Sequence, residues 1–121
     1  MHRILIVNDT LIVNKFIKHS LESEGFFVDT VMTGQEGIAC ARGRAYNIIL
    51  LDYHLPDING DEVCRAIKAD PNIAKTPVYY ISSLEKEAMA RVIDQTGAEG
   101  YLDIAIDIDE LCEKIKGLLG V

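Results

Sequence analysis

The stretch IILLD at residues 48–52 is an unbroken apolar run that ends on a carboxylate. A run without polar alternation is typical of a strand buried on both faces of a parallel sheet. Pro56 and Gly60 follow Asp52 at four-residue steps. Because α/β sheets bind ligands outside the carboxyl ends of their strands, Asp52 is predicted to stand where chemistry takes place. A helix N-cap or a turn residue is the alternative for an isolated Asp after a strand.

Five apolar runs punctuate the sequence, and each is followed by a segment of helical character. The runs lie at 4–7, 27–31, 48–51, 78–81 and 101–102, and the helical segments at 13–21, 34–44, 60–69, 85–95 and from 107 onward. This alternation predicts an α/β protein with a doubly wound (βα)5, flavodoxin-like fold and a parallel five-stranded sheet. Right-handed crossovers favour the strand order 2-1-3-4-5, which places the first and third strands side by side.

Length and composition predict one domain over residues 1–121. The chain is 49% hydrophobic and 26% charged, and no apolar run approaches the roughly 20 residues of a membrane span. The first apolar run is too short for a signal peptide, so a cytoplasmic location is expected, away from the membrane. A formal charge of −7 argues against direct binding to nucleic acid, which needs clustered Lys and Arg. The three cysteines are widely spaced and are interpreted as structural thiols.

The first helical segment has an amphipathic pattern. Its apolar residues fall at three- and four-residue steps, at Val13, Phe16, Ile17 and Leu21. This spacing predicts that these four side chains share the buried face of one helix.

Two carboxylates are predicted to meet at the edge of the sheet. Asn8 and Asp9 follow the first strand, which the predicted order places beside the strand that ends at Asp52. Asp9 and Asp52, with a backbone carbonyl nearby, would form an oxygen-rich pocket of the kind that holds Mg²⁺ together with waters and a phosphate oxygen. Alternatively, Asp9 caps the first helix, together with Thr10.

Four motifs in the same order along nearly the whole chain resemble the receiver domains of response regulators of the chemotaxis-regulator type. They are ILIVND at 4–9, LDYHLPDING at 51–60, VYYISS at 78–83 and GAEGYL at 97–102. The resemblance implies the receiver domain of a two-component phosphorelay, which is a phosphoacceptor and not an enzyme. Its partners would be a histidine kinase or phosphotransfer protein and a downstream target protein. No output domain follows within this sequence, as in stand-alone regulators, although a receiver cut from a longer protein would look the same.

The resemblance also implies roles for individual residues. Asp52 would be the phosphoacceptor and would form an acyl phosphate. Asp9, Asp52 and the backbone carbonyl of His54 would bind Mg²⁺, while the His54 side chain would be solvated. Ser82 would hydrogen-bond a phosphoryl oxygen. Tyr101 would be the switch residue that turns inward when Ser82 moves, and a plain core role for Tyr101 is the alternative.

Two positions depart from the family pattern. Asn8 stands where the family has an acid, and Ile104-Ala105 stand where the fifth strand is followed by Lys-Pro. The lysine would contact the phosphoryl group, and loss of such a charge-assisted bond costs on the order of 1.5–3 kcal/mol. Because one acid and one lysine are both absent, the formal charge of the site is unchanged, so we interpret the two changes as a compensated pair. Without proline, the bond before Ala105 is expected to be trans. The apolar rim at 104–106 is core packing or part of a docking patch.

Other function classes are compatible with parts of the pattern. A pseudo-receiver, which binds proteins independently of phosphorylation, would explain Ile104 but not the retained Asp9, Asp52 and Ser82. A flavodoxin-type flavin protein would need a phosphate cradle of Ser, Thr and Gly amides after the first strand, where this chain has an acid. A dehalogenase-type phosphatase would need a second acid two residues after its nucleophile, where this chain has His54.

Overall fold

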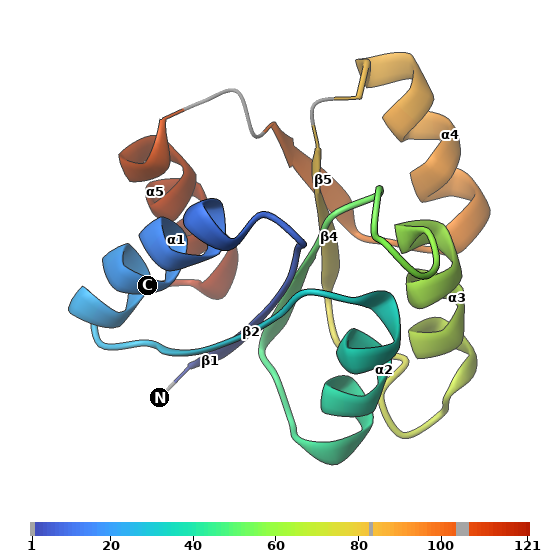
Figure 1. Cartoon of the computed structure of the whole chain (residues 1–121), viewed down its shortest axis with the longest axis horizontal. Coiled ribbons are helices and arrows are strands. Elements are labelled where there is room, and N and C mark those ends of the chain that lie inside the picture. The colour runs from blue at the N-terminus through green and yellow to red at the C-terminus, as the bar shows by residue number, and fades with distance from the viewer. Residues whose placement is uncertain (1, 83, 104–106) are drawn as a thin grey trace.

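The computed structural model describes residues 2–82, 84–103 and 107–121. In this part of the chain strands and helices alternate strictly, as β1 (Arg3–Val7), α1 (Leu11–Ser23), β2 (Phe27–Val31), α2 (Gly34–Gly43), β3 (Ile48–Leu51), α3 (Gly60–Ala69), β4 (Val78–Ser82), α4 (Lys86–Thr96), β5 (Gly100–Asp103) and α5 (Ile108–Leu119). The strands form one parallel sheet in the order β2-β1-β3-β4-β5 (Figure 1). The predicted fold and strand order are confirmed.

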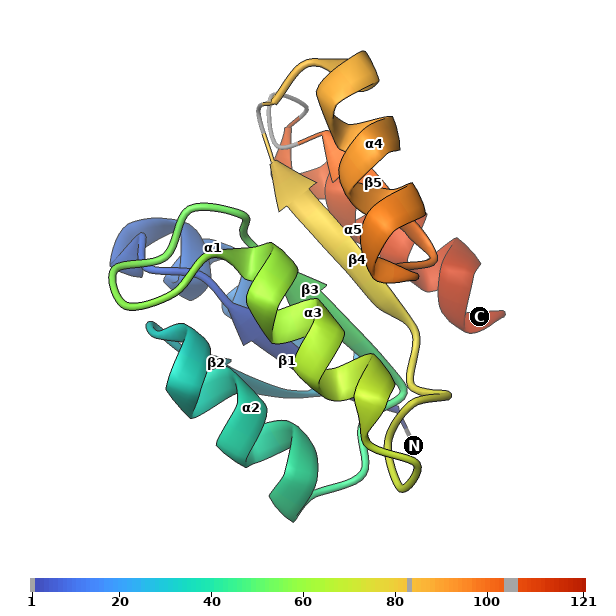
Figure 2. The same cartoon turned by 90° about the vertical axis from the view of Figure 1, so that its right-hand side faces the viewer.

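Helices cover both faces of the sheet. In Figures 1 and 2, α1 and α5 lie on one face, and α2, α3 and α4 lie on the other. Each face has its own apolar core, and β3 contributes to both of them. Ile49 and Leu51 pack toward α2–α4, whereas Ile48 and Leu50 pack toward α1 and α5. This two-sided burial explains why residues 48–51 show no polar alternation.

The buried face of α1 differs from the predicted one. Asn14, Ile17 and Leu21 are the buried residues of this helix, and Phe16 is 59% exposed. Successive residues of a helix are separated by about 100° around its axis, so Phe16 lies well to the side of Ile17. The prediction that Phe16 is a core residue was wrong, and the polar Asn14 takes a buried position instead.

The carboxyl ends of β1 and β3 are in register. Val7 pairs with Leu51, and the Asp52 backbone N–H donates to the Val7 carbonyl at 2.8 Å. The residues that leave these two strands, Asn8-Asp9 and Asp52, therefore emerge side by side. Within the described ranges, no helix has the length and apolar character needed to cross a membrane.

Candidate functional site

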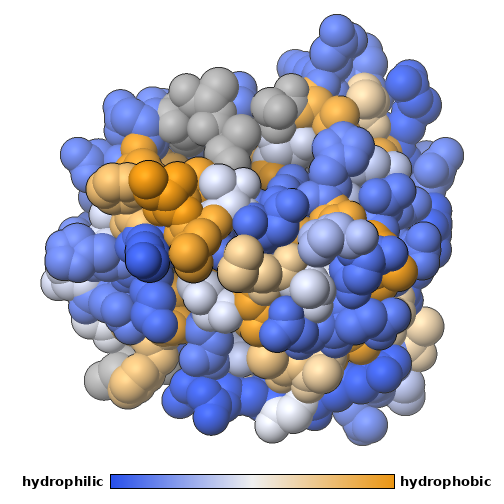
Figure 3. Space-filling model, viewed as in Figure 1, coloured by the Kyte–Doolittle hydropathy of each residue, from blue (hydrophilic) through white to orange (hydrophobic). Residues whose placement is uncertain are grey.

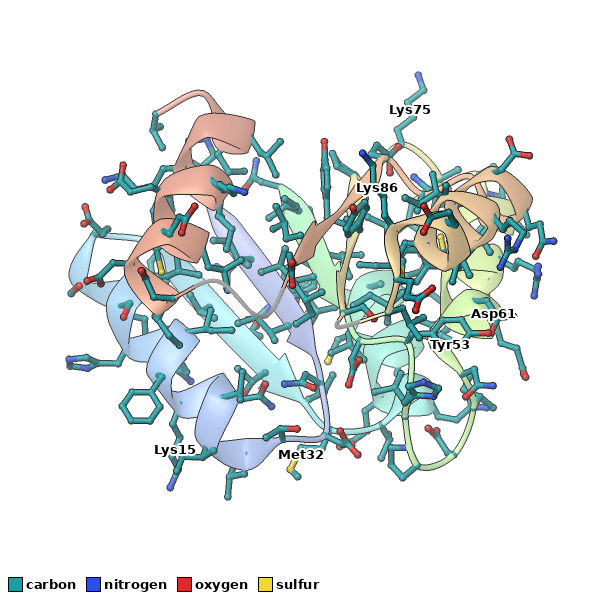
Figure 4. The ribbon with its side chains drawn as sticks, turned by 90° about the horizontal axis from the view of Figure 1, so that it is seen from above. Lys15, Met32, Tyr53, Asp61, Lys75 and Lys86 are labelled. Atoms are coloured by element: carbon teal, nitrogen blue, oxygen red, sulfur yellow. The ribbon has the colours of Figure 1, made fainter. Side chains whose placement is uncertain are left out.

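The site lies at the carboxyl edge of the sheet, which Figure 4 shows from above. Asp9 follows β1 and is exposed, and Asp52 follows β3 and is half-buried. Burial raises the pKa of Asp52 above its ordinary value, and the negative charge of Asp9 raises it further. Hydrogen bonds from the backbone N–H groups of Tyr53 and His54 act in the opposite direction and lower this pKa. The predicted proximity of Asp9 and Asp52 is thus reflected in their electrostatic interaction.

The donor set of this edge fits a magnesium ion. In the part of the chain that the structure describes, no three Asp, Glu, His or Cys side chains are grouped so that they could hold a metal ion. Asp9 and Asp52 would therefore need backbone and water oxygens as further ligands. Mg²⁺ is usually bound in this way, by one or two carboxylates and several waters, whereas Zn²⁺ favours three or four side-chain ligands. A cation would also offset the repulsion that raises the pKa of Asp52.

The loop after β3 is closed at its base by a glycine. The Gly60 N–H donates to the Tyr53 carbonyl at 2.6 Å. A Cβ atom on Gly60 would collide with the backbone of Asp52 and Tyr53, so only glycine permits this approach. The glycine that the sequence places eight residues after Asp52 is therefore a geometric requirement of this loop. In Figure 4, Tyr53 lies on the side of the sheet that α3 covers, and its ring meets the exposed His54 edge-on at 5.1 Å.

Asn8, at the end of β1, is held by a residue that the sequence analysis missed. Both Asn8 and Asn14 of α1 are buried. Asn14 Nδ2 donates to the Asn8 carbonyl at 2.7 Å, and Asn8 Nδ2 donates to Asn14 Oδ1 at 3.0 Å. Asn8 Oδ1 is buried and has no hydrogen-bond partner among the described residues. The available signal was a polar residue inside the apolar segment of α1, a position where burial requires a partner.

Ser82 ends β4 and is buried. Its Oγ accepts a hydrogen bond from the Leu84 backbone N–H at 3.0 Å, which leaves its O–H available as a donor. The register of β3 and β4 pairs Leu51 with Tyr80, two residues before Ser82. Ser82 therefore reaches the same edge of the sheet as Asp52.

Comparisons with known proteins show the family to which the chain belongs. A family model described as the response regulator receiver domain matches residues 4–116. The chain belongs to this family. Response regulator ArlR of Staphylococcus saprophyticus is 36% identical to this receiver domain over 120 residues, which are 98% of this chain and 53% of that protein. The receiver domain thus spans about half the length of the curated relatives that it matches.

Solved structures resemble the receiver domain over nearly its whole length. The chemotaxis protein CheY4 of Vibrio cholerae has a TM-score of 0.90 at 22% identity, with 98% of each chain covered, a likeness that concerns the fold. The receiver domain of the sensor histidine kinase PA1611 from Pseudomonas aeruginosa has a TM-score of 0.87 at 26% identity, with 99% of this chain and 98% of that chain covered. That structure has a magnesium ion coordinated in its active-site cleft.

The remaining predicted residues lie on β5 and beyond. Tyr101 pairs with Tyr80 and is half-buried against the core on the α2–α4 face of this receiver domain. This position is compatible with both roles considered for Tyr101, as switch and as core residue. Ile104 and Ala105, with the predicted trans bond and the apolar rim at 104–106, lie outside the described residues.

Proposed function

We propose that Asp52 is the phosphoacceptor of this receiver domain and that it reacts with Mg²⁺ bound. One observation carries the proposal: Asp52 is a half-buried carboxylate at the end of a fully buried strand, beside Asp9, with its pKa raised by burial and by that neighbour. Such perturbed carboxylates in a partly desolvated setting are candidates for chemistry. The role is a phosphoacceptor, without action on a separate substrate.

The chemistry follows from the residues at this edge. An oxygen of the ionised Asp52 carboxylate attacks the phosphorus of the donor, the bond from phosphorus to the donor's nitrogen or oxygen breaks, and an acyl phosphate forms. The Tyr53 and His54 amides orient the carboxylate. The Ser82 hydroxyl donates to a phosphoryl oxygen, and Tyr101 turns inward in response. Asp9, Asp52 and the His54 carbonyl would hold Mg²⁺, whose positive charge would neutralise the phosphoryl oxygens.

The partner that delivers the phosphoryl group is a histidine kinase or a phosphotransfer protein, and a downstream target protein receives the signal in the cytoplasm. The exposed side of α1 supports a protein contact near the site. Leu11, Ile12 and Phe16 are 54%, 64% and 59% exposed, and α1 begins two residues after Asp9. Figure 3 shows apolar side chains gathered over this part of the molecule. We assign this surface to the phosphodonor protein, because exposed apolar clusters mark interaction sites.

Intact-mass measurement after incubation with a small-molecule phosphodonor tests the proposal. The wild-type chain should gain one phosphoryl group when Mg²⁺ is present, and Asp52→Asn should gain none. If the wild-type chain gains no adduct that depends on Mg²⁺, the chain acts as a pseudo-receiver. An adduct that persists on Asp52→Asn would assign the acceptor to another residue.

A further inference from the structure

Asp57, in the loop after β3, caps the N-terminus of a different helix. Its Oδ1 accepts a hydrogen bond from the Gly34 N–H at 2.8 Å, and its Oδ2 accepts one from the Gln35 N–H at 2.9 Å. Both donors belong to the first turn of α2, more than twenty positions earlier in the chain. The carboxylate thus bridges two elements that the chain does not connect directly. Figure 2 shows the start of α2 beside this loop.

The first turn of α2 depends on Asp57 for the partners of two of its backbone N–H groups. A helix leaves its first four N–H groups without partners inside the helix. In α2, the Thr33 Oγ1 accepts from the Glu36 N–H at 3.1 Å, and the first regular helical bond runs from the Gly37 N–H to the Thr33 carbonyl at 3.0 Å. Asp57 accepts from the N–H groups of Gly34 and Gln35, which precede them. Residues 33–37 alone therefore do not supply partners for all N–H groups at the start of α2, and the loop after β3 supplies the others.

Side-chain packing holds the same two segments together. A Cβ atom on Gly34 would lie 2.5 Å from Ile58 Cγ1 and 2.8 Å from Val63 Cγ2. The loop and the beginning of α3 therefore lie directly against the backbone of α2. Because Ile58 follows Asp57, the polar and apolar contacts act at the same point of the loop.

These contacts define both ends of a short segment that contains a proposed metal ligand. At one end the Tyr53 carbonyl accepts from the Gly60 N–H, and at the other end Asp57 is bound to α2. Only three residues, 54–56, separate the two anchors, and proline at position 56 restricts the backbone further. The His54 carbonyl, which we propose as a ligand of Mg²⁺, therefore depends on Asp57 for its position.

We propose that Asp57 is a positioning residue that couples the first turn of α2 to the phosphoacceptor site. The inference rests on the proposed function, since it concerns the metal site of Asp52. The Gln35 and Gly34 amides hold the pKa of Asp57 below its ordinary value, so the carboxylate is charged when it caps the helix. Coupling between two sites is reciprocal. Mg²⁺ binding should therefore protect the amides of residues 34 and 35, and loss of the cap should weaken Mg²⁺ binding.

The test compares Asp57→Ala with Asp107→Ala. Asp107 is a matched control, because its side chain caps α5 by accepting from the Glu110 N–H at 2.8 Å and takes no part in the loop after β3. Asp57→Ala should raise the Mg²⁺ concentration for half-maximal phosphorylation by about tenfold, the lower end of the range for residues that orient metal ligands, with little change in the maximal rate. Hydrogen exchange should quicken at residues 34 and 35 in Asp57→Ala and at residue 110 in Asp107→Ala.

The results separate positioning from general stability. Unchanged Mg²⁺ dependence in Asp57→Ala, despite faster exchange at residues 34 and 35, would overturn the proposal, as would an equal loss in Asp107→Ala. If Asp57→Ala does not fold, Asp57→Asn retains one acceptor and should show a smaller shift in the same direction. If the wild-type chain gains no phosphoryl group but Mg²⁺ still protects residues 34 and 35, the proposed function fails and the coupling stands. Mg²⁺ binding to the wild-type chain without that protection would refute the coupling alone.

Discussion

Asn8 and Asp52 follow neighbouring strands, but they differ in burial, charge and hydrogen bonding. Both follow strands whose last residues are buried and paired, Val7 with Leu51. Asn8 is neutral, only 1% exposed and held by Asn14, whereas Asp52 is half-buried and ionisable, with its pKa raised by burial and by Asp9. At this edge of the sheet, Asn8 is therefore fixed by contacts within the protein, whereas the charge of Asp52 is available for a ligand to balance.

The difference follows from the hydrogen-bonding capacity of the groups. A backbone carbonyl can only accept, so Asn14 must direct its Nδ2 at the Asn8 carbonyl and its Oδ1 at the Asn8 side chain. Asn8 therefore donates from its own Nδ2 to Asn14 Oδ1, and its Oδ1 is left without a hydrogen-bond partner among the described residues. An aspartate at position 8 has no N–H and could not complete this arrangement. Asn14 therefore favours a neutral residue at position 8, a reason that is independent of the hypothesis of charge compensation with Ile104.

The largest effect on stability is expected for Asn14→Leu. The substitution would remove the partners of the Asn8 carbonyl and of Asn8 Nδ2, each a buried polar group that costs about 1–3 kcal/mol when unsatisfied. We expect the free energy of unfolding to fall by about 2–6 kcal/mol, measured by urea denaturation. Lys15→Leu, at the next and exposed position, should change it little. Equal effects of the two substitutions would show that the amide pair does not stabilise the end of β1.

A second prediction concerns Ile104, the other half of the compensated pair. The family pattern has its phosphate-binding lysine at position 104, so Ile104→Lys is expected to restore a charge-assisted contact worth about 1.5–3 kcal/mol and to change the lifetime of phosphorylated Asp52 by about tenfold or more. The decay of the intact-mass adduct measures this lifetime. Unchanged phosphorylation and lifetime would remove the basis for regarding Asn8 and Ile104 as a compensated alteration.

Asn8→Asp tests whether the two strand ends are interchangeable. Without Mg²⁺, we expect this substitution to lower the free energy of unfolding by about 1–2 kcal/mol, because a buried carboxylate would face Asn14 Oδ1. Urea denaturation at neutral pH measures the loss. A variant as stable as the wild-type chain would mean that the Asn14 side-chain amide can flip without a loss of stability.

Asp52→Asn should have a smaller effect of opposite sign. Because the folded-state pKa of Asp52 is raised, the native chain binds more protons than the unfolded chain between the ordinary pKa and the raised one, so stability falls as pH rises through this window. Above it the ionised carboxylate carries the full cost, and Asp52→Asn should then be more stable than the wild-type chain. The gain in stability of Asp52→Asn should vanish below the ordinary Asp pKa of about 3.9. Urea denaturation of both proteins at neutral pH and below this pKa measures the difference. A variant less stable at neutral pH would contradict this account.

The sequence predicted what depends on local pattern. The apolar run at 48–51 predicted a strand buried on both faces, and the crossover rule then placed Asp9 beside Asp52. Gly60 was evident from its spacing. These features need no information about distant partners, which is why the sheet order and the edge of the site followed from the sequence.

The features that were missed depend on contacts between distant segments. The pattern of α1 assigned Phe16 to the core by its hydrophobicity. Of Phe16 and Asn14, however, Asn14 is the buried residue, because it forms hydrogen bonds at the end of β1. Asp57 was read only as part of a motif, since its hydrogen bonds to α2 require that the loop and the helix be placed together. A polar residue acquires such a role only from its tertiary partner, which hydrophobic periodicity does not reveal.

The central claim is that Asp9 and Asp52 are the only carboxylates that the site needs, together with the His54 carbonyl and waters, to hold Mg²⁺ for phosphorylation while position 8 remains neutral. The most direct test is the rate of phosphoryl adduct formation as Mg²⁺ is titrated, for the wild-type chain and for Asp9→Asn. We predict a saturable dependence on Mg²⁺ in the wild-type chain and a large loss of it in Asp9→Asn, with Asp52 still present to react. The same Mg²⁺ dependence in both proteins would contradict the claim.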